Sequence, residues 1–95
     1  MLVGEKVEKE WLREKTTLKQ AEEENMVKDD SLGPEPIPFG FMNWVWQIFK
    51  RHLKEGDEIW KFSSSKKKWL NLTGRAGLCI VRDEEIVFSI VTKMN

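Results

Sequence analysis

The spacing of apolar residues changes at Gly56, and this change limits the chain to folds that combine helix with sheet. From Phe41 to Lys54, apolar residues recur every three or four positions, which is the pattern of an amphipathic helix. After Gly56 they fall into three short segments, DEIWKFSS, AGLCIV and EIVFSIVTK, whose alternating or continuous apolar character is typical of strands. The chain is therefore predicted to be an α+β protein.

The three predicted strands follow one another closely along the chain. The last two are separated by RDEE, which is short enough for a hairpin; the turn type stays open, because Asn-Gly or Asp-Gly is missing. Residues 76–81 are almost continuously apolar, so we expect this strand at the centre of the sheet. We predict a three-stranded antiparallel meander covered by the helix of residues 41–54. The expected core consists of Trp44, Val45, Ile48, Phe49, Trp60, Leu78, Ile80, Phe88 and Ile90.

The N-terminal third has a different composition. Residues 5–28 are rich in Glu, Lys, Gln, Ala and Leu and contain neither Gly nor Pro, which favours a helix. A narrow apolar stripe on this helix is formed by Val7, Trp11, Leu18 and Ala21. Gly33 and three alternating prolines then predict an extended, stiff connector. Within a single domain overall, we therefore distinguish an acidic helical segment, residues 1–33, from a compact α+β part, residues 34–95.

Charge is distributed unevenly along the chain, although the formal net charge is zero. Division after Glu35 gives six basic and ten acidic residues in the first part, and ten basic and six acidic residues in the second. This asymmetry indicates either an acidic tail beside a basic binding domain or two segments of one molecule that attract each other. The longest mostly apolar segment, residues 37–49, is far shorter than the roughly 20 residues of a membrane span, so we expect no membrane partner.

Residues that can perform chemistry are scarce. His52 is the only histidine and lies at the cationic end of the predicted helix, and Cys79, the only cysteine, lies within the most apolar strand. One histidine and one cysteine do not complete a zinc site, and the sequence has neither a calcium loop nor a phosphate loop. We therefore expect no enzymatic activity, no catalytic residue, no metal and no cofactor. The lone cysteine, with no recognisable secretion leader, indicates the reducing cytoplasm.

Interaction with another macromolecule is the remaining class of function. Aromatic side chains exceed what one helix and three strands need, and we expect the surplus to serve a protein partner or a homodimer. The candidate interaction residues are Trp11, Trp46 and Trp69.

The alternative is single-stranded nucleic-acid binding by the connection between the first and second predicted strands. There Lys66, Lys67, Lys68 and Arg75 would hold phosphates, and Trp69 would stack on an unpaired base. Leu72 of the same connection is expected to pack beneath the sheet. Salt-dependent binding would separate this function from the first.

Several short sequences near the C-terminus carry a resemblance. GDEIW at residues 56–60, GRAG at 74–77, VRD at 81–83 and IVTKMN at 90–95 look like short bacterial hypothetical proteins without an assigned activity. The resemblance is confined to the predicted strands. It implies a bacterial cytosolic module and carries over no catalytic or binding residue.

Overall fold

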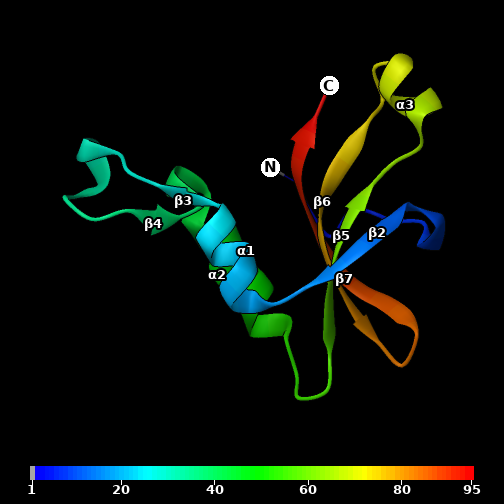
Figure 1. Ribbon diagram of the computed structural model, residues 1–95, viewed down its shortest axis with the longest axis horizontal. Helices are drawn as coiled ribbons and strands as arrows, with labels where there is room; N and C mark the ends of the chain where they lie inside the picture. The colour runs from blue at the N-terminus through cyan, green and yellow to red at the C-terminus, as the bar shows by residue number, and fades with distance from the viewer. Residues whose placement is uncertain (1) are drawn as a thin grey trace.

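An antiparallel sheet organises the computed structural model, which describes residues 2–95 (Figure 1). Its five strands lie in the order β1-β7-β6-β5-β2. They are β1 Leu2–Val3, β2 Leu12–Thr16, β5 Glu58–Ser63, β6 Arg75–Arg82 and β7 Glu85–Met94. β3 Met26–Val27 and β4 Ile37–Pro38 form a separate hairpin. The helices are α1 Leu18–Glu24, α2 Asn43–His52 and α3 Lys66–Leu70, with 3-10 turns η1 Lys9–Trp11, η2 Asp30–Leu32 and η3 Gly40–Met42. The predicted α+β class is confirmed.

The three predicted strands are present as β5, β6 and β7, which pair as consecutive antiparallel neighbours. The prediction that they make up the whole sheet is wrong, because β1 pairs with β7 and β2 pairs with β5 at the two edges. Both added strands come from the first segment of the chain. Residues 2–33 therefore contribute two strands to the sheet in addition to α1, and are not one continuous helix beside it.

The turn between β6 and β7 consists of Asp83 and Glu84. Both have positive φ, 51° and 68°. Positive φ at both central residues is the mark of a type I′ turn, whose twist matches that of the paired strands. The hairpin turn therefore forms without the asparagine or glycine that usually occupies these two positions.

Most of the helix predicted for residues 5–28 is absent, since only residues 18–24 are α-helical. Thr17 begins this helix: its side chain accepts a hydrogen bond from the Gln20 backbone N–H at 3.1 Å. The preceding residues 12–16 instead form β2, which satisfies the backbone hydrogen-bonding groups along the open edge of β5. Lys15 lies 2.7 Å from the Glu58 carboxylate across this edge. Pairing in the tertiary structure therefore overrides local helix propensity.

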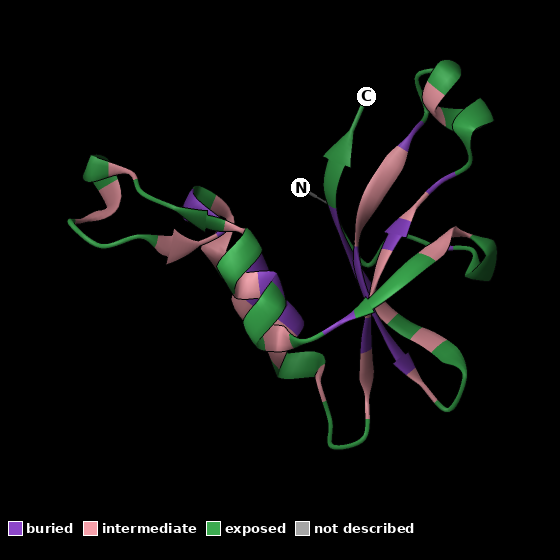
Figure 2. Ribbon diagram, in the orientation of Figure 1, coloured by how far each residue is buried: buried purple, intermediate pink, exposed green. Residues whose placement is uncertain are grey.

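α2 packs on one face of the sheet (Figure 2). Val45, Trp46 and Phe49 are fully buried there. The Trp46 and Phe49 rings stack with their centroids 5.1 Å apart, and the Trp46 indole N–H donates to Glu22 Oε2 of α1 at 2.7 Å. The remaining buried members of this cluster are Ala21, Phe39, Ile59, Leu78, Ile80 and Ile90. α2 is thereby held by both the sheet and α1.

The opposite face of the sheet is covered by the chain between β1 and β2. Val7 of this segment is buried against the sheet, and the Trp11 ring stacks on Phe62 at 6.3 Å between centroids. The cluster also contains Cys79, Val81 and Val91. The continuous apolar character of β6 follows, because both faces of this central strand are covered.

The predicted core is correct for five residues, namely Val45, Phe49, Leu78, Ile80 and Ile90, which are buried. Ile48, Trp60 and Phe88 are half-buried. The assignment of Trp44 to the core is wrong, because its side chain is 58% exposed. α2 carries two adjacent apolar rows, and the sheet covers the row of Val45 and Phe49 while leaving the row of Trp44 outside.

Residues 26–38 form a projecting hairpin that we call the arm (Figure 1). The predicted proline connector is extended at β4, but it pairs with β3 and so returns along the chain. Two hydrogen bonds hold the base of the arm: the Phe39 N–H donates to the Asn25 carbonyl at 2.7 Å, and Asn43 Nδ2 donates to the Pro38 carbonyl at 2.9 Å. The arm is therefore anchored to both helices but projects beyond them.

A bidentate ion pair joins the segment after α2 to the central strand. Arg82 Nε and Nη2 donate to the two Asp57 oxygens at 2.9 and 2.8 Å, and the Lys54 backbone N–H also donates to this carboxylate at 2.8 Å. These hydrogen bonds, led by that from Arg82, lower the pKa of Asp57 from 3.8 to about 2. The Asp57 side chain is only 2% exposed, so water screens the pair little.

We expect the stability that depends on Asp57 to be lost in acid. A carboxylate whose pKa is lowered by folding stabilises the protein above its unfolded pKa of 3.8, and this stability disappears as pH falls through about 2. The unfolding free energy of Asp57→Asn should therefore lie below that of the parent at neutral pH and converge with it between these values. Urea unfolding at a series of pH values measures the difference. A constant difference down to pH 2 would contradict the assignment.

Candidate functional site

The two residues best suited to nucleophilic or acid–base chemistry do not meet. His52 stacks on the Phe88 ring, with centroids 3.8 Å apart, and its Nδ1 lies 2.9 Å from the Ile48 carbonyl. Cys79 is completely buried in the core cluster on the face of the sheet opposite α2, and burial raises the pKa of its thiol to about 12. Neither residue therefore has the base or nucleophile that a catalytic pair requires within reach.

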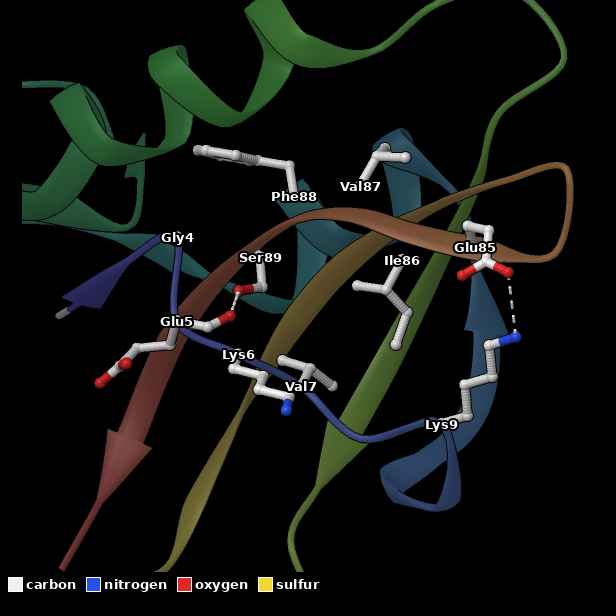
Figure 3. A pocket seen from close by; sticks show the side chains of 10 residues that line it. All are labelled: Gly4, Glu5, Lys6, Val7, Lys9, Glu85, Ile86, Val87, Phe88 and Ser89. Carbon is white, nitrogen blue, oxygen red and sulfur yellow. Dashed lines mark hydrogen bonds and ion pairs between the residues drawn. The ribbon is translucent and has the colours of Figure 1, made fainter.

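A shallow pocket lies between residues 4–9, which belong to the chain between β1 and β2, and the first half of β7 (Figure 3). Two of its polar contacts are made within the protein: Lys9 Nζ lies 3.5 Å from Glu85 Oε1, and the Ser89 hydroxyl donates to the Glu5 carbonyl. Ile86 points toward Val7, whereas Phe88 points the other way, toward α2. The pocket lining contains none of the histidine or cysteine side chains that could supply a base or nucleophile there.

Residues 2–95 contain neither a metal-binding cluster nor a membrane-spanning helix. This part of the chain holds no cluster of three or more His, Cys, Asp or Glu side chains with the geometry of a metal site. None of its helices combines the length and the apolar character that crossing a bilayer requires.

The three tryptophans predicted to face a partner occupy different environments. Trp46 is fully buried, so the expectation that it is surplus to the core is wrong. Trp11 is half-buried on Phe62, and Lys68 Nζ lies 5.9 Å from the centroid of its ring. The half-buried Trp69 donates its indole N–H to Ser63 Oγ at 3.0 Å. None of the three is the exposed aromatic that the sequence was expected to provide.

The lysine-rich connection between β5 and β6 is a folded unit, which we call the tip and define as residues 64–74. Its lysines 66, 67 and 68 lie on the short helix α3, are exposed, and form no ion pair with any residue in the described range 2–95. Arg75 follows the tip and donates from Nη1 to the Gly74 carbonyl at 2.8 Å. The predicted phosphate-holding residues are thus close in sequence and space, but Arg75 is half-buried.

Trp69 is not placed as a free stacking platform. A Cβ atom at Gly74 would lie 2.1 Å from the indole ring, so the ring rests directly against the Gly74 backbone. Stacking on a base requires an accessible ring face, and at least one face of Trp69 is occupied within the protein. The exposed apolar residues of the tip are Leu70 and Leu72, at 72% and 73%. The prediction that Leu72 packs beneath the sheet is wrong.

A second exposed apolar surface follows α2 and begins at the base of the arm. Phe41 and Trp44 are 66% and 58% exposed, and the half-buried Ile48 continues their row at helical spacing. We call these three residues the outer stripe. Val27 of the arm, 42% exposed, packs against Gly40, the residue before Phe41, because its Cγ1 would be 3.0 Å from a Cβ at Gly40.

Charges of opposite sign lie toward the two ends of the outer stripe. Arg51 and Lys54 are exposed at the C-terminal end of α2, while Asp30 and Glu35 are exposed on the arm, which meets the N-terminal end. None of these four residues forms an ion pair with another residue in the part of the chain that is described, 2–95. The surface therefore has an apolar centre, with cations in excess at the C-terminal end of α2, where Glu55 is also exposed, and carboxylates in excess on the arm, where Lys28 is also exposed.

Comparison with known proteins adds no assignment. No protein-family model matches the chain, and neither the curated proteins nor the solved structures contain a match to it.

Proposed function

We propose that the chain is a cytoplasmic, non-catalytic interaction module that self-associates through the outer stripe. The observation that carries this proposal is the exposure of Phe41 and Trp44, 66% and 58%, on a helix whose inner side is completely buried. Aromatic side chains contribute strongly to association once an interface covers them. Folding of one chain leaves these two uncovered, so a second surface over them gains apolar burial.

The arrangement of charge supports a second copy as the partner. In a two-fold dimer, the same surface is used by both subunits and each contact occurs twice. If the two α2 helices lie antiparallel, Arg51 and Lys54 of one copy face Asp30 and Glu35 on the arm of the other. The arm extends from the N-terminal end of α2 away from the sheet (Figure 1), which is the direction this pairing needs.

Sedimentation velocity of the full chain over a range of concentrations tests the proposal. We expect a reversible dimer, and we expect Trp44→Glu to raise its dissociation constant at least about 30-fold, equivalent to roughly 2 kcal/mol. Val87→Glu is the matched control, because Val87 is 42% exposed on β7 and should leave the dimer unchanged. A parent protein that remains monomeric at high concentration would exclude self-association. Removal of residues 1–33 is unsuitable as a test, since it deletes β1 and β2.

A charge exchange tests the antiparallel geometry separately. Arg51→Glu with Lys54→Glu should weaken the dimer, and addition of Asp30→Lys with Glu35→Lys should restore it. The parent dimer should also weaken as salt rises, because the interacting charges are exposed. If the variant with all four substitutions dimerises no better than the variant with Arg51→Glu and Lys54→Glu alone, the two α2 helices do not pair in the antiparallel direction.

Single-stranded nucleic-acid binding through the tip is the second candidate function. The three exposed lysines support it, because they form no ion pair within residues 2–95 and would be available to phosphates. The position of Trp69 against Gly74 weakens it, since at least one face of the only aromatic ring in the tip is already covered and is not available to a base. We therefore rank it below self-association.

A further inference from the structure

The tip is rigidly built where it leaves the sheet. The Ser64 N–H donates to the Arg75 carbonyl at 2.8 Å, and the Arg75 N–H donates to Ser64 Oγ at 2.9 Å. Ser65 begins α3, since its side chain accepts from the Lys68 N–H. The Gly74 N–H and the Trp69 carbonyl are both bound by the Asn95 side chain, at 2.9 and 2.7 Å. The tip is therefore a fixed projection at one end of the sheet (Figure 1).

Leu72 occupies a position that folding alone does not explain. The Leu72 N–H donates to the Trp69 carbonyl and the Thr73 N–H donates to the Lys68 carbonyl, which is the hydrogen-bond pattern of a Schellman motif at the end of α3. Leu72 is the left-handed residue of this motif, with φ of 61°. Glycine or asparagine fits this conformation with less strain than leucine. Leucine therefore costs stability here, and burial compensates little of this cost because the side chain is 73% exposed.

Leu70 and Leu72 are both exposed in a cationic part of the chain. They are the most exposed large apolar side chains among those that the structure describes, at 72% and 73%. No Asp or Glu occurs between Glu58 and Asp83. Three lysines precede the leucines on α3, and Arg13 of β2 donates to the Ser63 carbonyl at 2.8 Å at the base of the tip. The two exposed leucines therefore follow directly after three exposed cations in the chain.

We propose that the tip docks on an anionic lipid bilayer, with Leu70 and Leu72 inserted among the acyl chains and Lys66, Lys67 and Lys68 at the lipid phosphates. Membrane-surface binding combines burial of a few apolar side chains with attraction between cations and anionic headgroups. A bilayer explains the leucines better than a nucleic acid does, because aliphatic side chains do not stack on bases whereas hydrocarbon covers them. This surface is separate from the outer stripe. No membrane partner was expected from the sequence because no apolar segment is long enough to span a bilayer. Binding of the tip to a bilayer surface requires no such segment.

Sedimentation with vesicles tests this proposal on the full chain. We expect binding to phosphatidylcholine vesicles that contain about one third phosphatidylserine, and little binding to phosphatidylcholine alone. Leu72→Asn should lower the vesicle affinity at least about tenfold, because one inserted leucine is lost. The same variant should melt at the parent's temperature or above it, since asparagine suits the left-handed position. Loss of vesicle binding by a fully folded variant would thus identify the tip as the inserted element.

Two control variants distinguish the contribution of the leucines to vesicle binding from that of the lysines and from nonspecific adsorption of exposed apolar side chains. Lys66→Gln with Lys67→Gln should reduce binding to the anionic vesicles and its dependence on salt. Val87→Asn replaces an exposed apolar side chain that lies outside the tip and should leave vesicle binding unchanged.

Several outcomes would overturn the proposal. These are absence of binding to the anionic vesicles, equal binding to both vesicle types, and unchanged binding by Leu72→Asn. Tryptophan fluorescence titration with a short single-stranded oligonucleotide provides the remaining comparison. Strong, salt-sensitive quenching that Leu72→Asn retains, together with weak vesicle binding, would assign the tip to nucleic acid. Because Trp44→Glu changes only the outer stripe, it should keep its vesicle binding even if it no longer dimerises.

Discussion

Replacement of Ile80 by aspartate is expected to abolish the cooperative thermal unfolding transition. Ile80 is completely buried in β6, where it lies opposite Ile59 of β5 and Phe88 of β7. An aspartate there would either place a charge in the apolar cluster beneath α2 or take up a proton, and both states lose the apolar packing. The cost should exceed about 4 kcal/mol, which is a large part of the stability of a small domain.

Circular dichroism during heating measures this effect. Val87→Asp is the matched control, because it introduces the same side chain into the neighbouring strand at a site that is 42% exposed. The control should melt cooperatively near the parent's temperature. A normal melting curve for Ile80→Asp would mean that β6 does not lie between the two core clusters.

Gly77→Ala is expected to destabilise the protein by about 3 kcal/mol. The register of β6 against β7 shifts between Ala76 and Gly77, and the β7 backbone comes unusually close at this point. A Cβ atom at Gly77 would lie 2.0 Å from the Ile90 carbonyl oxygen and 3.0 Å from the Thr92 nitrogen. Because both contacts are with backbone atoms of a paired strand, one side-chain rotation does not relieve them.

Urea unfolding compares this variant with Ala76→Gly, which changes the same methyl group at the preceding residue. The control should lose only about 0.5–1 kcal/mol, the usual cost of a glycine in a strand. Equal losses in both variants would show that β7 does not approach Gly77 as closely as described. The N-terminal end of β6 and the residue that follows β7 hold the tip in place. Gly77→Ala should therefore also weaken the binding of the tip to anionic vesicles.

The candidate surfaces were only partly predictable, since exposure depends on what covers a residue. The sequence identifies lysines 66, 67 and 68 as a basic group, and the structure leaves them exposed. It does not identify Leu70 or Leu72 as exposed, because an apolar residue in a connection is equally compatible with packing beneath the sheet. The left-handed φ of Leu72 is the informative signal, and it exists only once α3 and its hydrogen bonds have formed.

Which of Trp44 and Trp46 is buried also depends on what covers each residue. Both lie on a helix that the apolar spacing predicts correctly, and two adjacent apolar rows made either arrangement consistent with that spacing. Trp46 became the buried residue because α1 lies beside α2 and its Glu22 accepts the indole hydrogen bond at 2.7 Å. α1 reaches that position only through the strand that precedes it. The exposed aromatic therefore depends on a contact between distant segments.

The apolar periods of α2 and of the three strands β5, β6 and β7 are strong enough to predict all four elements, and the short turn between β6 and β7 predicts their pairing. Pairing between distant segments set the role of the N-terminal segment, whose charged residues 12–16 favour a helix locally but pair with β5. It also decided that residues 26 to 38 return on themselves as the arm. The physical reason is the same in both cases: an open strand edge offers unpaired backbone groups to any nearby chain, and the energy of pairing them outweighs weak local preference.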